Sequence, residues 1–377
     1  MKIKYLVRGF LFLMILSVFS CTKEEEHFIP KPDDNLPDTI PVWTFDKYPG
    51  KEWTISSPLK YGYNPSYSQV ISKFITQYTN TTGLVVVVGG EIIYTYGNLT
   101  ELSYLASCRK SLLAMLYGKY VVNGTIDLEK TIDDLGFDDV GGLLPIEKTA
   151  RVYHLITARS GVYHLGSNLG DDRAYAPERG TKIPGEYYLY NNWDFNCAGA
   201  AFETMTGLNI YDAFQADIAI PIQMQDFSRS AQQKSGDLTI SVFPAYHFWL
   251  STRDMARIGY LMLRGGKWND TQVIPAEWAT QIVSIVTPLQ EMNPVSRRSG
   301  YFGYGIMWWI WDGYANKDAF KGAYTAMGAY GQFITVLPAL DMVVAHKTSS
   351  GDTPWDPYYQ LILLITDAQI TKNYLNK

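Results

Sequence analysis

The chain has 377 residues, of which 47% are hydrophobic and 14% aromatic, so it can bury the core of one large domain or two interleaved domains. Its formal net charge is −5, its pI is about 5.6, and only 18% of its residues are charged. This balance supplies no basic surface for phosphate groups, and it excludes nucleic acid as an expected partner.

The N-terminus has the features of an export signal. Lys2, Lys4 and Arg8 form a basic start, and residues 10–19 form an apolar run that is short for a membrane span. Cys21 follows a small residue, an ending that resembles a bacterial lipoprotein signal, although valine stands three residues before the cysteine where leucine is usual. The alternative is an ordinary secretory signal that leaves this cysteine free.

The lipoprotein resemblance implies that residues 1–20 are removed and that Cys21 carries lipid. It predicts a protein anchored in the bacterial cell envelope, facing the periplasm or the cell surface, with the membrane as a partner through that lipid. Residues 21–50 are acidic and rich in proline and have few apolar positions, so we expect a tether there. Residues 51–377 are expected to form the folded domain.

The first predicted elements of the domain are a helix within residues 61–79 and a β-hairpin. The hairpin has strands at residues 84–88 and 92–96, joined by a tight turn at Gly89-Gly90. Because its first strand is entirely apolar, we expect that strand to be buried on both faces. A helix then begins near Ser107, and a loop leads into a short helix within residues 122–130.

The later pattern is helical at first and returns to strands near the C-terminus. Helices are predicted over residues 211–220, 251–264 and 275–286, strands over 302–311, 332–337 and 342–346, and a final helix over 357–371. Strands therefore occur in the parts at about 60–120 and 300–377, with a mostly helical part at about 121–299 between them. This pattern predicts an α+β domain.

The candidate chemistry centres on residues 106–111, where Ser107 stands three residues before Lys110 at the start of a helix. This spacing places both side chains on one face of the first turn, and a helix N-terminus favours negative charge nearby. Lysine can act as a base if burial or a cationic neighbour lowers its pKa. A chain of this length contains roughly one such pair by chance, so the alternative is a solvated helix surface.

Three further segments occur in a fixed order after this pair. They are residues 152–162, which end in a Ser-Gly turn, Tyr190-Asn191-Asn192 before an apparent helix at 193–206, and residues 326–332 before a late strand. Together they resemble the serine β-lactamase and penicillin-binding superfamily, in its class C-like branch with esterases, D-amino-acid peptidases and 6-aminohexanoate-dimer hydrolases. The resemblance spans about residues 60–370. It implies a β-lactamase/transpeptidase-like fold, in which helices flank an antiparallel sheet and a mostly helical subdomain is inserted.

The resemblance also implies roles for individual residues. Ser107 is the acyl-forming nucleophile, Lys110 its activating partner and Tyr190 the proton relay, while Asn192 contacts Lys110 and the carbonyl side of the substrate. An unperturbed tyrosine is a poor base at neutral pH, so a cationic Lys110 would have to lower the pKa of Tyr190. Which of the two takes the proton stays open at this point. With 28 tyrosines in the chain, a place in the core is the alternative for Tyr190.

The third motif departs from the superfamily pattern of Lys-Thr-Gly, whose lysine attracts the substrate carboxylate. Ala326-Met327-Gly328 stands in its place, with neither cation nor hydroxyl. The backbone amides of Ala329 and Ser107 are still expected to form the oxyanion hole, each contributing roughly 3 kcal/mol. Two other cations are candidates for the missing charge: Lys347, which we expect in an exposed turn, and Lys321.

Aromatic residues near this motif have two interpretations. Trp308, Trp309 and Trp311 with Tyr330 could line the substrate pocket, but alternating aromatic residues in a strand more often belong to the core. Cys108 and Cys197 are expected to be small buried apolar residues. The five histidines show no ligand spacing, so no metal site and no cofactor are predicted.

The expected activity is that of a serine hydrolase that forms an acyl-enzyme with a small-molecule or peptide-like ester or amide. Without the motif lysine, a β-lactam loses a charge contact, and we expect at most feeble lactamase activity. One alternative is a β-lactamase or D-Ala-type peptidase proper. Another is a non-catalytic binding or sensor protein of the cell envelope that keeps the fold.

Overall fold

A computed structural model describes residues 47–370 of the chain. The predicted signal of residues 1–20, the predicted lipidation site Cys21 and most of the predicted tether lie outside the described residues. No helix within the described range is both long enough and apolar enough to cross a membrane.

Residues 47–50, which the sequence assigns to the tether, pack against the folded domain. The Lys47 side chain forms an ion pair with the buried carboxylate of Glu91. The backbone carbonyl of Gly50 accepts a 2.8 Å hydrogen bond from the guanidinium of Arg257. The domain therefore begins before residue 51, because these contacts extend its N-terminal edge.

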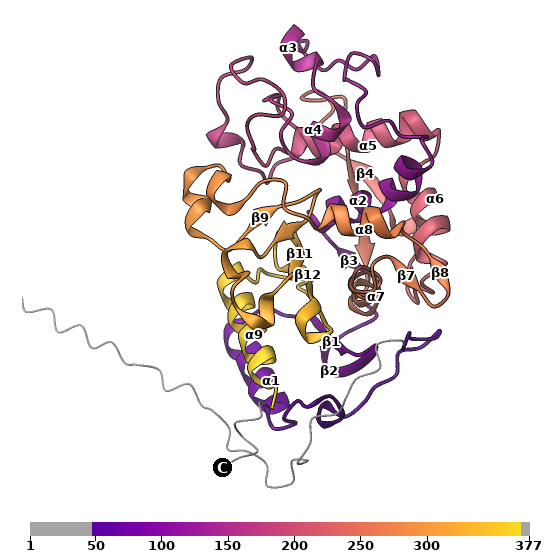
Figure 1. Cartoon of the computed structure of the whole chain (residues 1–377), viewed down its shortest axis with the longest axis vertical. Coiled ribbons are helices and arrows are strands. Elements are labelled where there is room, and N and C mark those ends of the chain that lie inside the picture. Colours follow the sequence, from indigo (N-terminus) through magenta and orange to yellow (C-terminus); the bar gives the residue numbers. More distant parts are fainter. Residues whose placement is uncertain (1–46, 371–377) are drawn as a thin grey trace, which may run out of the picture. The chain divides into compact units, whose positions relative to one another are not determined.

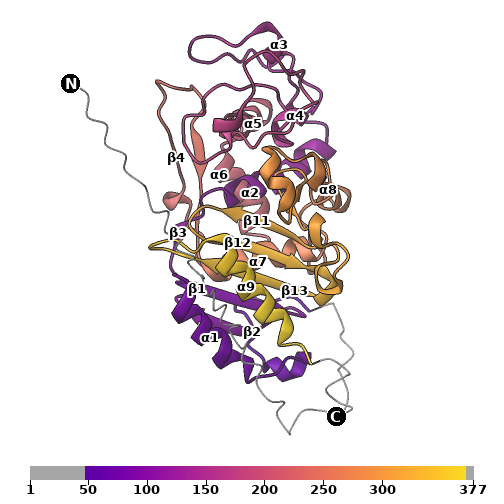
Figure 2. The ribbon, with the colours of Figure 1, turned by 90° about the vertical axis from the view of Figure 1, so that its left-hand side faces the viewer.

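A seven-stranded sheet, in which every neighbouring pair is antiparallel, forms the centre of the domain (Figure 2). The strand order is β2-β1-β13-β12-β11-β10-β9, so strands from the beginning and the end of the chain lie side by side. This arrangement confirms the predicted α+β class. The bounds are β1 (Gly83–Val88), β2 (Glu91–Gly97), β9 (Gly303–Tyr304), β10 (Trp309–Ile310), β11 (Tyr324–Gly328), β12 (Gln332–Leu337) and β13 (Met342–Lys347).

The predicted hairpin is present as β1 and β2. Gly89 and Gly90 connect the strands with φ angles of 58° and 81°, values that residues with a side chain rarely adopt. All six residues of β1 are buried, because the strand lies between β2 and β13 and has helices on both faces. The prediction of a strand buried on both faces is confirmed.

Side chains of the sheet alternate between two cores. Leu84, Val86 and Val88 of β1 belong to the core beneath α1 (Tyr67–Tyr78) and α9 (Trp355–Asp367). Val85 and Val87 belong to the larger core on the other face, which contains side chains of α2 (Cys108–Val122) and α7 (Thr252–Leu263). Figure 2 shows α1 and α9 side by side on their face of the sheet. The sheet therefore separates the α1/α9 layer from the layer that begins at Ser107.

The chain between β2 and β9 forms a mostly helical part, as predicted, with three additional two-stranded sheets (Figure 1). Besides α2 and α7, its α-helices are α3 (Pro145–Lys148), α4 (Val152–Ile156), α5 (Asn192–Thr206), α6 (Ile210–Phe214) and α8 (Ala276–Ile282). The small sheets pair β3 (Ser103–Tyr104) with β6 (Trp249–Leu250), β4 (Gln233–Ser235) with β5 (Ala245–His247), and β7 (Lys267–Trp268) with β8 (Thr271–Gln272).

Short turns of 3₁₀ helix complete the described structure. Those that come before β9 are η1 (Pro58–Tyr61), η2 (Arg173–Tyr175), η4 (Arg229–Ala231), η5 (Leu289–Glu291) and η6 (Val295–Ser299). Those that follow β10 are η7 (Asp312–Tyr314), η8 (Asp318–Phe320) and η9 (Pro338–Leu340). Of these turns, η6 matters most for the candidate site described below.

Three predicted elements differ from the structure. The strand predicted over 302–311 is split into β9 and β10 by a turn in which Met307 has a φ of 58°. The helix predicted over 211–220 is α6 followed by a π-helical turn, Gln215–Ala219, which directs Asp217 toward α2. The residues after Gly124 form turns instead of the predicted short helix.

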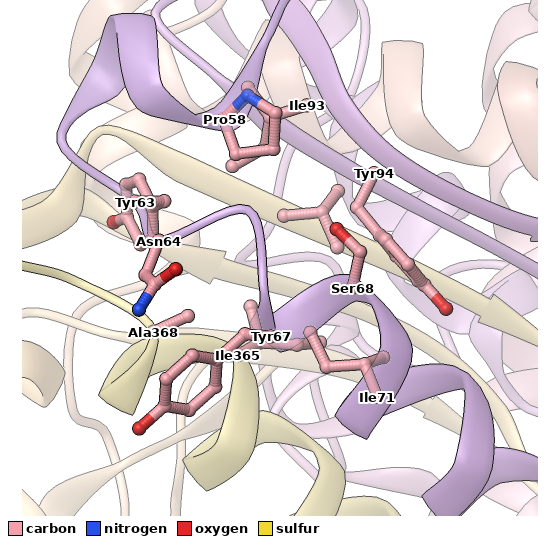
Figure 3. A pocket seen from close by; sticks show the side chains of 11 residues that line it. Pro58, Tyr63, Asn64, Tyr67, Ser68, Ile71, Ile93, Tyr94, Ile365 and Ala368 are labelled. Atoms are coloured by element: carbon pink, nitrogen blue, oxygen red, sulfur yellow. The ribbon is translucent and has the colours of Figure 1, made fainter. Parts of the chain in front are cut away.

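A small apolar hollow lies on the α1/α9 side of the sheet (Figure 3). Side chains of α1, β2 and the end of α9 line it, and the hydroxyl of the buried Tyr63 has no hydrogen-bond partner within residues 47–370. Because the sheet separates this hollow from α2, it is not part of the candidate site at Ser107. The lining residues are Pro58, Tyr63, Asn64, Tyr67, Ser68, Ile71, Val86, Ile93, Tyr94, Ile365 and Ala368.

Candidate active site

Ser107 occupies the sharp turn between β3 and α2. The Leu105 amide donates a 2.9 Å hydrogen bond to the Phe248 carbonyl, which extends the pairing of β3 with β6 toward the turn. Ala106 then has a φ of 48°, a conformation that costs free energy for a residue with a side chain. Ser107 is the N-cap residue of α2 and is half-buried, so its hydroxyl lies at a strained and well-fixed turn.

Lys110 lies one helical turn beyond Ser107 and is 1% exposed. Its Nζ is 2.7 Å from the Ser107 Oγ and 2.7 Å from the hydroxyl of Tyr190. The amino group also lies over the rings of Tyr190 and Phe195, at 4.6 and 4.8 Å from the ring centroids. The structure therefore brings Tyr190, which lies 80 positions after Lys110 in the sequence, next to the Ser107–Lys110 pair.

The ionisation of Lys110 and Tyr190 is shifted in opposite directions. Burial and then the charge of Arg109 hold the pKa of Lys110 well below its ordinary value, and Asp171 opposes them. Burial raises the pKa of Tyr190, although its hydrogen bond with Ser107 works the other way. For Tyr190 to act as the base its pKa would have to be lowered, but burial dominates and raises it.

Tyr190 is held from both of its sides. It precedes α5, whose N-cap Asn191 accepts a 3.2 Å hydrogen bond from the Trp193 amide. Its ring packs against Phe195 and Trp309, with centroid distances of 4.9 and 5.3 Å. This packing leaves the hydroxyl directed at Lys110, where it makes the 2.7 Å contact.

The Asn192 side chain is buried next to this group but is bonded elsewhere. Its Nδ2 donates a 2.9 Å hydrogen bond to the Leu169 carbonyl, and its backbone amide donates one to the Asp171 carboxylate at 2.9 Å. Its Oδ1 is buried and has no hydrogen-bond partner in the part of the chain that the structure describes. The side-chain hydrogen bond of Asn192 therefore goes to Leu169 and not to Lys110.

The altered third motif ends directly beside Ser107. A Cβ atom on Gly328 would lie 2.4 Å from the Leu105 carbonyl oxygen and 3.2 Å from the Ser107 nitrogen, so only glycine fits here. Ala329 follows, and Tyr330 is 57% exposed with a φ of 66°. The end of β11 at Gly328 therefore lies against the backbone that carries Ser107, one residue before Ala329.

Neither candidate cation replaces the motif lysine. Lys347 was expected in an exposed turn, but it is buried at the end of β13, and its Nζ donates to the carbonyls of Leu250 and Glu101. Burial lowers its pKa to about 8. The exposed Lys321 precedes β11, at the end of that strand opposite Gly328.

The tryptophans belong to the core, as the favoured of the two interpretations predicted. Trp308, Trp309 and Trp311 are at most 6% exposed, and of these three Trp309 packs against the ring of Tyr190. Cys108 and Cys197 are buried and unpaired. Among the described residues, no group of three or more histidine, cysteine or acidic side chains is placed to hold a metal ion.

Two features near the site were not predicted from the sequence. Arg109, inside the same helical turn as Ser107 and Lys110, is 1% exposed. Arg297 of η6 forms a bidentate ion pair with Asp172 at 2.6 and 2.8 Å and lies over Trp309. The position of Arg109 between the nucleophile and the lysine was visible in the sequence, whereas the pairing of Arg297 with Asp172 spans 125 residues and left no local signal.

The sequence profile described as Beta-lactamase matches residues 69–364, which is most of the chain. The chain belongs to the beta-lactamase family. An uncharacterized protein of Alkalihalophilus pseudofirmus is 25% identical over 113 residues, or 29% of this chain, and the match spans about a third (32%) of that protein's length.

Solved structures share the family fold at low sequence identity. A proposed 6-aminohexanoate-dimer hydrolase from Bacillus anthracis has a TM-score of 0.61 and 19% identity, covering 85% of this chain and 86% of its own. EstCE1, described as a hydrolase with promiscuous acyltransferase activity, has a TM-score of 0.58 and 13% identity over 81% and 98% of the two chains. A penicillin-binding protein from Bacillus halodurans has a TM-score of 0.57 and 15% identity over 78% and 99%.

Proposed function

We propose that this chain is a serine hydrolase that forms an acyl-enzyme at Ser107 with an uncharged ester or amide. The observation that carries the proposal is the position of Lys110, whose Nζ lies 2.7 Å from both the Ser107 Oγ and the Tyr190 hydroxyl. A nucleophile and a base within hydrogen-bond distance, with a third group orienting the base, form the general arrangement for covalent catalysis.

In the proposed acylation, neutral Lys110 accepts the proton of Ser107 as the Oγ attacks the substrate carbonyl carbon. The carbonyl oxygen becomes an oxyanion, which the backbone N–H groups of Ser107 and Ala329 stabilise. Collapse of this intermediate breaks the bond to the alcohol or amine, which leaves with the proton from Lys110, relayed through Tyr190. A water molecule then attacks the ester at Ser107 by the same steps, which releases the acid and restores the Ser107 hydroxyl.

The proposed roles of Lys110 and Tyr190 follow from their environments. Burial and Arg109 lower the pKa of Lys110, which favours the neutral amine as the proton acceptor near neutral pH. The raised pKa of Tyr190 keeps its hydroxyl protonated, as a relay requires. The unpartnered Oδ1 of Asn192 is assigned to a donor on the substrate, such as an amide N–H.

The proposed substrate class follows from the chemistry of the third motif. Ala326 and Met327 offer neither charge nor hydroxyl where the superfamily lysine attracts a carboxylate. An uncharged substrate has no carboxylate, so it loses no binding contact at this position. Two structural neighbours are named as hydrolases, one of them for an amide dimer, and this supports the hydrolase class. We place the chain in the class C-like branch on the same motifs.

Turnover of a panel of esters and amides tests this proposal. The turnover rate is measured for the unaltered protein and for Ser107→Ala. The substrates are p-nitrophenyl acetate, p-nitrophenyl butyrate, an aminoacyl p-nitroanilide and nitrocefin. Ser111→Ala is the matched control, because Ser111 lies on the same helix and its hydroxyl bonds the Met307 carbonyl. We expect ester turnover that Ser107→Ala abolishes and Ser111→Ala retains.

The two alternatives give different results in the same assay. Hydrolysis of nitrocefin at an enzyme-like rate, above that of the esters, would favour a β-lactamase or D-Ala-type peptidase proper. Failure to hydrolyse any member of the panel, together with an unreactive Ser107, would favour a non-catalytic binding or sensor protein of this fold. The altered third motif motivates the second alternative, and the close packing of Lys110 between Ser107 and Tyr190 opposes it.

We also propose that the protein is anchored in the bacterial cell envelope through lipid on Cys21. The support is the sequence of residues 1–21 alone, which lie outside the described residues. Metabolic labelling with an alkyne fatty acid tests the proposal, with Cys21→Ala as the control. We expect label on the unaltered protein in the membrane fraction and none on the variant, whereas equal labelling of both would contradict lipidation at this cysteine.

A further inference from the structure

Arg109 is a buried cation in the same helical turn as the proposed base. It is 1% exposed, and its Nη2 donates a 2.7 Å hydrogen bond to the Asn196 Oδ1 on α5. Its guanidinium lies 4.4 Å from the centroid of the Tyr246 ring on β5. Its Nη1 is buried and has no hydrogen-bond partner within residues 47–370.

No carboxylate forms an ion pair with Arg109 among the described residues. Its hydrogen-bond and ring partners, Asn196 and Tyr246, are both uncharged. Burying an unpaired charge is costly, and buried charges in proteins are normally paired. Arg109 therefore carries a largely uncompensated positive charge beside Lys110.

We propose that the uncompensated charge of Arg109 keeps Lys110 in its neutral, proton-accepting form. This inference rests on the proposed function, because it concerns the step in which Lys110 takes the proton of Ser107. Two positive charges in one buried turn repel each other, so protonation of Lys110 is disfavoured while Arg109 stays charged. Arg109 is thus a positioning residue that acts through the base and does not touch the substrate.

The other groups around Lys110 do not provide this effect. Tyr190 and the ring of Phe195 face it from the loop before α5 and from α5, and neither is charged. Cys108 on its own helix is a buried thiol. Burial, followed by the charge of Arg109, lowers the pKa of His247 on β5 to about 4, so this ring is neutral. The carboxylate of Asp171 works in the opposite direction and favours the ammonium form.

The field of Arg109 also reaches the other members of the site. It contributes to lowering the pKa of Tyr190, of Tyr104 on β3 and of Tyr246, in each case against the effect of burial. A phenolate form of Tyr190 is therefore less unfavourable when Arg109 is present. This assists a proton relay that passes through the tyrosine hydroxyl.

The pH dependence of acylation tests the inference. The second-order rate constant for reaction of Ser107 with a fluorophosphonate is measured from pH 5 to pH 10 for the unaltered protein, Arg109→Gln and Arg109→Lys. Acylation requires neutral Lys110, so the rate falls on the acidic side with the pKa of that lysine. We expect Arg109→Gln to move this acidic limb to higher pH by about one unit. At a pH on the limb, the rate constant should fall about tenfold, and at high pH it should equal that of the unaltered protein. Arg109→Lys should restore most of the original profile.

A second variant leaves the packing of Arg109 intact. Asn196→Asp is nearly isosteric and supplies the missing carboxylate at the 2.7 Å hydrogen bond, so it should also move the limb upward. This variant keeps the inference testable if Arg109→Gln does not fold. Arg257→Gln is the matched control, because Arg257 is also a fully buried arginine over an aromatic ring but lies on α7. Arg257→Gln should lower the unfolding temperature and leave the acidic limb of the pH–rate profile unmoved.

The outcomes separate this inference from the proposed function. If Arg109→Gln and Asn196→Asp react at Ser107 with an unmoved acidic limb, even at a uniformly lower rate, Arg109 is structural and the inference is overturned. If the unaltered protein does not react at Ser107 at any pH, the proposed function fails and the inference fails with it. An upward movement in both variants, with an unmoved limb in the control, supports the inference.

Discussion

The backbone N–H of Asp172 donates a 2.9 Å hydrogen bond to the carbonyl of Tyr190. The Asp172 carboxylate also forms the ion pair with Arg297, whose guanidinium lies 5.2 Å from the centroid of Trp309. Trp309 packs against the Tyr190 ring, so this group of contacts holds both the backbone and the ring of the tyrosine. The placement of the Tyr190 hydroxyl thus depends on residues that do not touch Ser107.

Breaking the Arg297–Asp172 ion pair should reduce activity more than stability. Arg297→Gln and Asp172→Asn should each lower kcat/KM for the ester by about tenfold, because a small displacement of a reacting group is costly in rate. The side chain of Arg297 is 35% exposed, so the pair should contribute at most about 1 kcal/mol to stability. A double-mutant cycle on kcat/KM checks the coupling, with the exposed Arg151–Glu129 pair as the control. Fully additive losses would show that the two residues act independently.

Removing the hydroxyl of Tyr190 should impair acylation while leaving the fold intact. Tyr190→Phe should lower the acylation rate constant by about 10²–10⁴-fold, because the proton relay is lost. Its ring packing with Trp309 and Phe195 is unchanged, so the unfolding temperature should change little. Pre-steady-state measurement of p-nitrophenol release checks the rate. An unchanged acylation rate would remove Tyr190 from the proposed relay.

A side chain at Gly328 should displace the turn that carries Ser107. In Gly328→Ala the new Cβ would lie 2.4 Å from the Leu105 carbonyl oxygen, so the backbone must move. We expect kcat/KM to fall at least about 100-fold and the free energy of unfolding by about 1–3 kcal/mol. Gly50→Ala is the control, since no atom lies within 4 Å of its added Cβ. Ester hydrolysis and urea unfolding measure both quantities, and a fully active Gly328→Ala would contradict the close packing.

The buried His346 should make the protein sensitive to acid. Burial lowers its pKa from the ordinary 6.5 to about 4, although the hydrogen bond with the Gly331 carbonyl works in the opposite direction. Between pH 6.5 and pH 4 the unfolded chain binds a proton at this ring, whereas the native state does not. The contribution of His346 to the free energy of unfolding is therefore present above pH 6.5 and is lost as the pH falls toward 4. The loss for this residue should approach about 3 kcal/mol.

His346→Gln should remove this part of the acid sensitivity. Urea unfolding at pH 7, 5.5 and 4.5 measures the difference in free energy of unfolding between the two proteins. That difference should shrink as the pH falls, although the variant is expected to be less stable at pH 7 because it loses packing against Phe333 and Tyr358. A difference that is independent of pH would show that His346 does not titrate in this window.

Local patterns predicted much of the fold. The glycine turn and apolar run of the first hairpin, the strands at 332–337 and 342–346, and the helix capped by Ser251 all depend on neighbouring residues, and the structure contains each of them. Elements whose form depends on distant contacts were less accessible. The turn at Met307 interrupts a continuous apolar strand pattern, and the buried place of Lys347 depends on two backbone carbonyls more than 90 residues away.

The candidate site shows the same division. The spacing of Ser107 and Lys110 was visible within one helical turn, and the order of later motifs pointed to Tyr190 and Gly328. The ionisation of these groups was not accessible, because it depends on burial and on charges from other elements. Tyr190 has a raised pKa and Lys110 a lowered one for this reason. The hydrogen bond from Asn192 to Leu169 likewise depends on a loop that has no sequence signature.

The central claim is that Ser107 is the nucleophile, and a covalent adduct tests it most directly. The unaltered protein, Ser107→Ala and Ser111→Ala are treated with a fluorophosphonate and analysed by intact-mass and peptide mass spectrometry. We expect one adduct, located on Ser107, in the unaltered protein and in Ser111→Ala, and none in Ser107→Ala. Stoichiometric labelling of Ser107→Ala, or an adduct mapped to another serine in the unaltered protein, would contradict it.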